Sequence, residues 1–139
     1  MRRRSRTSVT YRGRVRLVLV DNDEGALELI HLDLGLEGHE IVATALDGEG
    51  AVTACAATRP DVLVVDYRMP PGIDGVEVAR RVLAAGTVGG VVLYSNYVDP
   101  RVVAEAEALG ARWLVKGDLV LLRAAVLASG HDRPPGSGG

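Results

Sequence analysis

The sequence predicts an α/β fold in which a five-stranded parallel sheet, ordered 2-1-3-4-5, forms the middle of a three-layer αβα sandwich. Short apolar runs alternate along the chain with segments of helical length, and no segment repeats another. The apolar runs also lack the period-two alternation of a sheet with one face in water, so helices must cover both faces. Right-handed crossovers then place the ends of the first and third strands side by side, where the strand order reverses.

Five strand–helix units are expected between residues 15 and 128. The expected strands are residues 15–20, 41–45, 61–66, 91–94 and 112–115. The expected helices are approximately residues 24–36, 49–58, 75–85, 100–109 and 119–128. In the first helix, Leu27, Ile30 and Leu34 recur at helical spacing and should form its buried face.

Helix-capping and helix-breaking residues set the boundaries of these elements. Gly38 ends the first helix, Asp47 and Gly48 turn the chain into the Ala-rich second helix, and Pro60 stops that helix. Asp74 and Gly75 are expected to make a turn that caps the third helix. The fourth helix begins at Asp99-Pro100 and ends before Gly110, because Asp accepts from free backbone N–H groups and Pro suits the first helical position.

Bulk composition indicates a single folded domain. The 139 residues can bury a sizeable core, and 47% apolar with 24% charged residues are ordinary values for a globular protein. Cys55 is the only cysteine, so the chain cannot form an intramolecular disulfide, which suits the expected cytoplasmic location. We interpret Cys55 as a small buried hydrophobic residue. No apolar run reaches membrane-spanning length, so no membrane contact is expected.

The two ends differ in composition from the predicted domain at residues 15–128. Six arginines and no acid give residues 1–14 a charge of +6, and the net charge of −2 leaves −8 on residues 15–139. We expect residues 1–14 to be a disordered leader, with nucleic-acid contact through its arginines as the alternative. The acidic domain itself disfavours direct nucleic-acid contact. Residues 129–139, rich in Gly, Pro and Ser, indicate a flexible tail or the beginning of a linker.

Polar side chains close four of the predicted strands. Asp21 and Asp66 follow the first and third strands, Ser95 closes the fourth, and Lys116 follows the fifth. The carboxyl ends of parallel strands meet at one edge of the sheet, where open α/β folds bind ligands. Lys116 is the only lysine among 16 Lys and Arg residues, and a compact ammonium suits a small site better than a planar guanidinium. Taken singly, Asp66 could be a turn cap and Lys116 a surface lysine; together they predict one polar crevice.

This arrangement resembles the receiver domain of two-component response regulators over residues 15–128. The matching residues are Asp21, the run Asp66-Tyr67-Arg68-Met69-Pro70 with Asp74-Gly75, Ser95 and Lys116. The resemblance implies a flavodoxin-like fold in which Asp66 accepts a phosphoryl group from a histidine kinase. A carboxylate is a suitable nucleophile for this step, and the accumulated negative charge calls for a divalent cation.

The resemblance also implies roles for the neighbouring residues. Asp21, Asp66 and the backbone carbonyl of Arg68 would hold Mg²⁺, with the Asn22 side chain beside them. Lys116 would pair with one phosphoryl oxygen, and Ser95 would donate a hydrogen bond to another.

Signal transmission in such a domain would involve Ser95 and Trp113. When Ser95 moves toward the phosphoryl group, the aromatic side chain of the fifth strand can turn inward. Trp113 stands where the family commonly has Tyr or Phe, and core packing of this residue is the alternative interpretation.

Three further positions depart from the family pattern. Asn96, next to Ser95, is larger than the small residue usual there and would crowd the entry of a phosphodonor. Asn22 stands where a second acid is usual, so the metal site loses one formal charge and its affinity for Mg²⁺ should fall. Asp23 or Glu24 would have to compensate, and sidedness along the strand argues against Asp23. Gly117 stands where many relatives have proline, so no cis peptide is expected there.

Four functions compete at this point. The leading hypothesis is a signalling module, not an enzyme, that is phosphorylated on Asp66 and switches a protein–protein contact surface for a downstream effector domain or protein. The first alternative is a degenerate receiver that acts as a phosphorylation-independent interaction module because Asn22 weakens the Mg²⁺ site. A metal-dependent hydrolase and a nucleic-acid binder acting through the leader are the others. A homodimer would form through helix 100–109, strand 112–115 and helix 119–128, the dimer face common in such domains.

Overall fold

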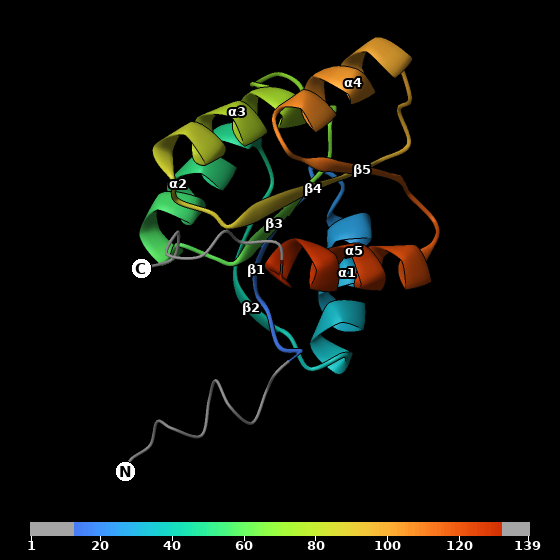
Figure 1. The fold of residues 1–139 in the computed structure, drawn as a ribbon. Helices are drawn as coiled ribbons and strands as arrows, with labels where there is room; N and C mark the ends of the chain where they lie inside the picture. The colour runs from blue at the N-terminus through green and yellow to red at the C-terminus, as the bar shows by residue number, and fades with distance from the viewer. Residues whose placement is uncertain (1–12, 132–139) are drawn as a thin grey trace.

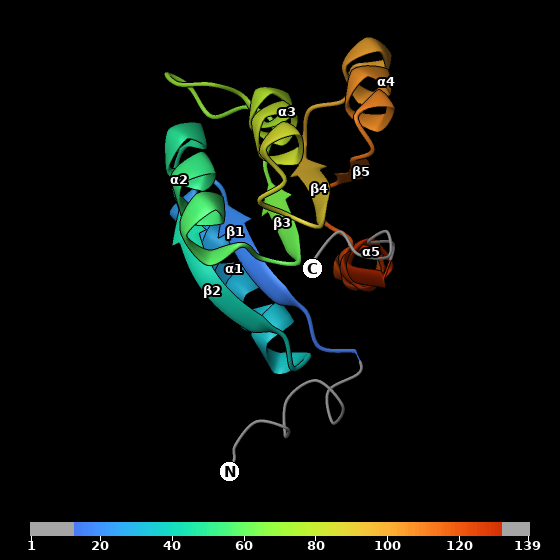
Figure 2. The same cartoon turned by 60° about the vertical axis from the view of Figure 1, so that its left-hand side comes forward.

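The computed structural model describes residues 13–131 and has the predicted α/β architecture (Figure 1). Five parallel strands pair in the order β2-β1-β3-β4-β5, which confirms the predicted sheet. The strands are β1 (Arg16–Val20), β2 (Glu40–Ala45), β3 (Val62–Val65), β4 (Gly90–Ser95) and β5 (Arg112–Val115). The helices are α1 (Glu24–Leu36), α2 (Gly48–Thr58), α3 (Gly75–Ala85), α4 (Pro100–Ala108) and α5 (Leu119–His131). Helices α1 and α5 cover one face of the sheet, and α2, α3 and α4 cover the other (Figures 1 and 2).

Two apolar clusters hold the helices on the sheet, one on each face. On the first face, Leu34 of α1 and Leu122 of α5 pack in one cluster with Leu19 of β1. On the second, Val78 of α3 belongs to a cluster that includes Leu63 of β3. All five side chains are fully buried. Because both faces of the central strands are covered, these strands read as continuous apolar runs rather than alternating ones.

The parallel register brings the ends of the strands to one edge of the sheet. Val20 of β1 pairs with Val65 of β3, and Val65 pairs with Leu93 of β4. Ser95 at the end of β4 pairs with Val115 of β5. The residues that follow these positions in the chain are therefore neighbours in space, although they are far apart in sequence.

Aspartate side chains start all five helices in the described part of the chain. Each carboxylate accepts a hydrogen bond from a free backbone N–H of the first turn, which is the usual role of an N-cap. The capping residues are Asp23, Asp47, Asp74, Asp99 and, before α5, Asp118. The predicted helix starts at Asp47, Asp74 and Asp99 are confirmed.

The predicted start of the tail at residue 129 is wrong, because α5 continues to His131. Ser129 is only 4% exposed, and its Oγ accepts a hydrogen bond of 3.0 Å from Arg112 Nε. Gly130 lies against Val15, since a Cβ at this position would be 3.2 Å from Val15 Cγ2. The Ser-Gly pair that resembles a linker in sequence is held in the helix by contacts with β5 and with the start of β1.

Most of the expected leader, residues 1–12, lies outside the described residues, as does the end of the expected tail, residues 132–139. Arg14, placed in the leader by composition, forms an ion pair of 3.9 Å with Glu40 at the start of β2. Among residues 13–131, no helix combines the length and apolar character needed to cross a bilayer.

A buried histidine joins the starts of β1 and β2. The backbone N–H of Val15 donates a hydrogen bond of 3.1 Å to Nδ1 of His39. His39 is only 9% exposed. Burial lowers the pKa of His39, and the nearby charge of Glu37 opposes this only in part. The neutral imidazole is therefore the form that the fold selects, because a proton on Nδ1 would remove the acceptor.

This contact predicts a pH-dependent stability with a definite sign. The folded-state pKa of His39 lies below the ordinary value of 6.5, so the unfolded chain takes up the proton first as the pH falls. The contribution of His39 is complete above pH 6.5 and is lost as the pH falls toward the folded-state pKa. We expect His39→Asn, which keeps an acceptor that does not titrate, to weaken the decline of the unfolding free energy between about pH 7.5 and 5.5.

The measurement is urea denaturation at several pH values. Replacement of the exposed His31 by Asn is the matched control and should retain the wild-type pH dependence. If the unfolding free energies of His39→Asn and of the wild type declined equally with falling pH, the role given to His39 would be wrong.

Candidate functional site

Three charged side chains meet at the carboxyl edge of the sheet. Lys116 Nζ lies 2.5 Å from Asp21 Oδ2 and 3.2 Å from Asp66 Oδ2. The side chains of Asp21, Asp66 and Lys116 are 3%, 11% and 16% exposed. The structure thus brings together the two aspartates and the single lysine, which directly follow β1, β3 and β5.

Each of the two carboxylates presents its Oδ2 atom to Lys116. Oδ1 of Asp21 accepts a hydrogen bond of 2.9 Å from the backbone N–H of Asp23. Oδ1 of Asp66 accepts a hydrogen bond of 2.7 Å from the backbone N–H of Tyr67. Each loop therefore fixes one oxygen of its carboxylate and leaves the other, Oδ2, for the lysine.

The ammonium is what allows two buried acids to lie together. Burial by itself lowers the pKa of Lys116, but hydrogen bonds and charges from Asp21 and Asp66 outweigh burial and raise the pKa above its ordinary value. Lys116 is therefore positively charged at neutral pH. Removal of one partner from such a buried group would leave an uncompensated charge, which is strongly destabilising.

Ser95 ends β4 at the same edge and is 2% exposed. Its Oγ accepts a hydrogen bond of 3.2 Å from the backbone N–H of Tyr97. The backbone carbonyl of Ser95 also accepts from the N–H of Lys116, at 3.1 Å. Ser95 is thus tied to the lysine through the backbone, while its hydroxyl faces the loop between β4 and α4.

The other expected metal ligands lie beside the two aspartates in the chain. Asn22 is exposed and follows Asp21 directly. Arg68 is exposed, and its guanidinium lies 4.2 Å from the centre of the Tyr97 ring. Asp23 caps α1 by accepting from the N–H groups of Gly25 and Ala26, so its carboxylate is engaged away from the site.

The atoms at this edge that could bind a metal are all oxygens, which is the ligand type that Mg²⁺ prefers. They are two carboxylates, the Asn22 amide and backbone carbonyls. In residues 13–131 no group of three or more His, Cys, Asp and Glu side chains is arranged to hold a metal. The donor set therefore fits a cation that keeps part of its water shell, but not one held by a dense cage of side chains.

Trp113 lies half-buried on β5 and packs against the core cluster of the α2–α4 face. Its ring centre is 5.5 Å from that of Tyr67. The indole Nε1 is buried without a hydrogen-bond partner among the described residues. Trp113 therefore contacts the loop that carries Asp66, which is the neighbourhood a switch residue requires, although the packing alternative explains the same position.

The loop after β3 is packed tightly beneath Asp66. Met69 is 1% exposed and belongs to the core. The N–H of Gly75 donates a hydrogen bond of 2.8 Å to the carbonyl of Tyr67, and this bond closes the loop. The Pro70–Pro71 bond is the one cis peptide in the described chain, and the bond after Lys116 is not cis, as predicted.

Sequence reasoning missed an aromatic contact at this edge. The rings of Tyr67 and Tyr97 stack with centres 5.1 Å apart and planes 19° apart. Burial, followed by the charge of Asp74, raises the pKa of Tyr67. The positions of the two tyrosines could have predicted this contact, since one follows Asp66 and the other lies two residues after Ser95.

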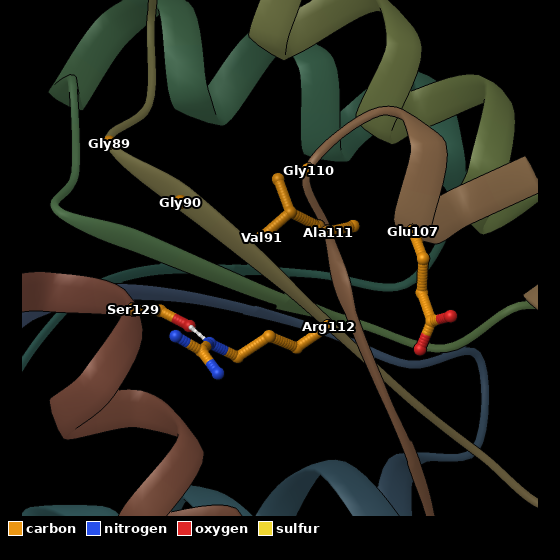
Figure 3. A pocket seen from close by; sticks show the side chains of 8 residues that line it. All are labelled: Gly89, Gly90, Val91, Glu107, Gly110, Ala111, Arg112 and Ser129. Atoms are coloured by element: carbon orange, nitrogen blue, oxygen red, sulfur yellow. Dashed lines mark hydrogen bonds between the residues drawn. The ribbon is translucent and has the colours of Figure 1, made fainter. Parts of the chain in front are cut away.

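A separate hollow of about 310 Å³ lies between β4, β5 and the end of α5 (Figure 3). Arg112 and Ser129 line it and are hydrogen-bonded there, with Glu107 and Gly90 also on its wall. It lies at the starts of β4 and β5, so it is separate from the cluster of Asp21, Asp66 and Lys116.

Comparison with known proteins agrees with this geometry. Residues 17–119 match the family model described as the response regulator receiver domain. The solved signal receiver domain of NarL from Mycobacterium tuberculosis is similar with a TM-score of 0.80 and 33% identity, over 86% of this chain and 98% of that one.

Two longer proteins are similar in sequence. The transcriptional regulatory protein AfsQ1 of Streptomyces coelicolor is 35% identical over 100 residues, which are 72% of this chain and 44% of that protein. A protein-glutamate methylesterase/protein-glutamine glutaminase of a Nocardioides species is 32% identical over 98 residues, 70% of this chain and 26% of that protein. The chain spans less than half the length of these curated relatives.

The packing beneath Asp66 predicts that Gly75 cannot be replaced without a shift of the loop. A Cβ at Gly75 would meet the carbonyl oxygen of Asp66 and lie 2.7 Å from Leu93 Cδ2. We expect Gly75→Ala to lower the unfolding free energy by about 1–3 kcal/mol. In urea denaturation the matched control Gly35→Ala, whose Cβ meets nothing within 4 Å, should raise the unfolding free energy by up to about 1 kcal/mol. A neutral Gly75→Ala would show that the loop is looser than described.

Proposed function

Because the chain belongs to the family of response regulator receiver domains, we propose that it is a phosphoacceptor that takes a phosphoryl group from a histidine kinase on Asp66. The modified domain would then change a protein–protein contact surface. The observation that carries this proposal is the contact of Lys116 with both Asp21 and Asp66 at the carboxyl edge of the sheet. A degenerate module that works without phosphorylation finds no support, since these three side chains are assembled.

The proposed reaction is a transfer between two nucleophiles. A lone pair on an Asp66 carboxylate oxygen attacks phosphorus and forms the O–P bond of an acyl phosphate. The bond between phosphorus and the kinase imidazole nitrogen breaks, and its electron pair stays on that nitrogen. The protein contributes position and charge: Lys116 would pair with a phosphoryl oxygen, and Ser95 would donate a hydrogen bond to another.

The proposed metal ligands are Asp21, Asp66, the backbone carbonyl of Arg68 and the side chain of Asn22. When bound there, Mg²⁺ would offset the negative charge that accumulates as phosphate approaches two carboxylates. Asn22 supplies a neutral oxygen, so the site has one negative charge fewer than two consecutive acids would give. Lys116, which contacts both carboxylates in the structure, is the side chain that shares in the same neutralisation.

Receiver domains act with histidine kinases and with effector domains, and the longer relatives show that the effector varies. One relative is a transcriptional regulator and the other a methylesterase/glutaminase. The domain described here is proposed as the signalling part, without turnover chemistry of its own. A switch through Ser95 and Trp113 and a homodimer through α4, β5 and α5 stay predictions.

Chemical phosphorylation tests the role of Asp66 without the unknown kinase. Incubation with acetyl phosphate and Mg²⁺ should add the mass of one phosphoryl group, and Asp66→Asn should abolish the adduct because the nucleophile is lost. Intact-protein mass spectrometry provides the measurement. Asp118→Asn, an exposed aspartate at the same edge, is the matched control and should still be labelled. An adduct of unchanged yield on Asp66→Asn would place the acceptor elsewhere.

A second prediction concerns the missing acid. Asn22→Asp should tighten Mg²⁺ binding, on the order of tenfold, because it adds a charge beside Asp21 in a partly exposed site. The fluorescence of Trp113, the only tryptophan, reports the titration, since its ring lies 5.5 Å from that of Tyr67 in the Asp66 loop.

Asn96→Asp is the matched control for this titration, because it adds the same charge on the exposed loop after β4. It should shift the Mg²⁺ midpoint less than Asn22→Asp does. Equal shifts in the two variants would indicate a general charge effect and would count against Asn22 as a ligand.

A further inference from the structure

The outward side of α1 is apolar, although it faces away from the sheet. Leu29, Leu32 and Leu36 lie opposite the buried side of the helix and are 55%, 62% and 77% exposed. Their spacing of three and four residues places them in one line, which is the pattern of a helix that packs against another helix. Exposed leucines scattered singly need no explanation, but three in line indicate an interaction surface.

The neighbouring helix α5 is apolar on its outward side as well. Arg123 is the only Asp, Glu, Lys or Arg among its 13 residues. Leu122 and Val126 are fully buried, whereas Val120 is 67% exposed and Ala124 is exposed. Because a helix that is apolar all round is normally buried, α5 has the composition of a helix that is covered on both sides.

An ion pair joins these two helices, which cover the same face of the sheet (Figures 1 and 2). Arg123 donates to both carboxylate oxygens of Asp33, at 2.5 and 3.1 Å, and its Nε lies 3.7 Å from Glu37 Oε2. The charges between α1 and α5 therefore offset one another within the chain. The exposed apolar residues of both helices are called the α1–α5 patch: Leu29, Leu32, Leu36, Val120 and Ala124.

The line of leucines on α1 is complementary to itself. When two α1 helices pack antiparallel about a two-fold axis near Leu32, Leu29 of one copy meets Leu36 of the other. The acid beside the line, Glu28, then lies near Gly35 of the second copy, where a Cβ would meet nothing within 4 Å in the single chain. A parallel pair would instead place two Glu28 carboxylates together, which is unfavourable.

The size of the patch also favours a contact between two folded domains. A 13-residue helix is about 20 Å long and about 10 Å wide, whereas a standard interface buries about 800 Å² on each partner. The outward side of α1 is too small for this by itself, and the outward side of α5 extends it. Helix α4 is a poorer candidate, because it exposes the charged side chains of Arg101, Glu105 and Glu107.

We propose that the α1–α5 patch is the contact between two copies of this chain, arranged about a two-fold axis near Leu32. Most homo-oligomers are symmetric, and the commonest interface is the same patch on both subunits. This contact shares α5 with the face predicted from the family, but it uses α1 in place of α4 and β5. It does not require phosphorylation of Asp66.

Sedimentation equilibrium of the unmodified 139-residue chain tests the proposal. The wild type should exchange between monomer and dimer at concentrations between about 1 μM and 1 mM, the range of weak to moderate affinities. Leu32→Glu should raise the dissociation constant on the order of tenfold or more, because it brings two like charges together at the axis. The matched control is Val115→Glu, since Val115 is 53% exposed on β5 and lies outside the patch. It should change the constant by less than about twofold.

Opposite charges at position 32 test the two-fold arrangement. Leu32→Glu and Leu32→Lys should each be mainly monomeric when alone, and an equimolar mixture should dimerise, because opposite charges then meet across the interface. A contact that does not bring position 32 of both copies together would not give this result. Leu32 is exposed, so the urea midpoint of each variant should equal that of the monomeric wild type.

Three results would overturn the proposal. A wild type that stays monomeric at about 1 mM would leave the patch to another protein. A dimer that is lost in Val115→Glu but kept in Leu32→Glu would place the contact on α4, β5 and α5. A mixture of the two Leu32 variants that stays monomeric would exclude the two-fold axis near Leu32. None of these outcomes depends on whether Asp66 accepts a phosphoryl group, which the acetyl phosphate adduct decides separately.

Discussion

The charge balance between one ammonium and two carboxylates is the interaction on which this site depends. Two acids buried at adjacent strand ends repel each other and lose hydration, and neither is tolerated without compensation. Lys116 supplies that compensation, at 2.5 Å from Asp21 and 3.2 Å from Asp66. The same two acids raise the pKa of the lysine against the effect of burial. Each charge is thus retained because of the others, which makes the cluster a unit and not a set of separate residues.

The fold distinguishes the aspartates of this unit from the many others at strand and helix ends. Asp23, Asp47, Asp74 and Asp99 have their carboxylates turned to the first turn of the following helix, where they satisfy free N–H groups. Asp21 and Asp66 come earlier in their loops, directly after a buried strand, and give Oδ2 to Lys116. The place of an acid within its loop therefore decides whether it serves a helix or the site: Asp21 precedes the N-cap Asp23 by two residues, and Asp66 precedes the N-cap Asp74 by eight.

The sequence was sufficient for most of the fold, and the exceptions have a common physical origin. Alternating apolar runs and capping residues predicted the strand order and the ends of α1 and α3, because these depend on local pattern and topology. The end of α5 was missed because Ser129 and Gly130 favour a linker locally, whereas Arg112 and Val15 hold them in the helix. The stack of Tyr67 on Tyr97 was missed for the same reason, since it joins two loops whose separation no local pattern encodes.

The proposed reaction would disturb the cluster in a direction that the structure makes specific. Phosphorylation of Asp66 would replace a singly charged carboxylate by a group carrying up to about two negative charges. Lys116, still held by Asp21, would share the neutralisation of that increase with the proposed Mg²⁺, and a neutral hydrogen-bond donor would stabilise a remaining phosphoryl oxygen. Ser95 is the donor at this edge that can turn without breaking an ion pair, and its oxygen is bound to the backbone of Tyr97. Since Tyr97 also contacts the N-cap of α4, a change in charge at Asp66 has a continuous set of contacts through which to reach that helix.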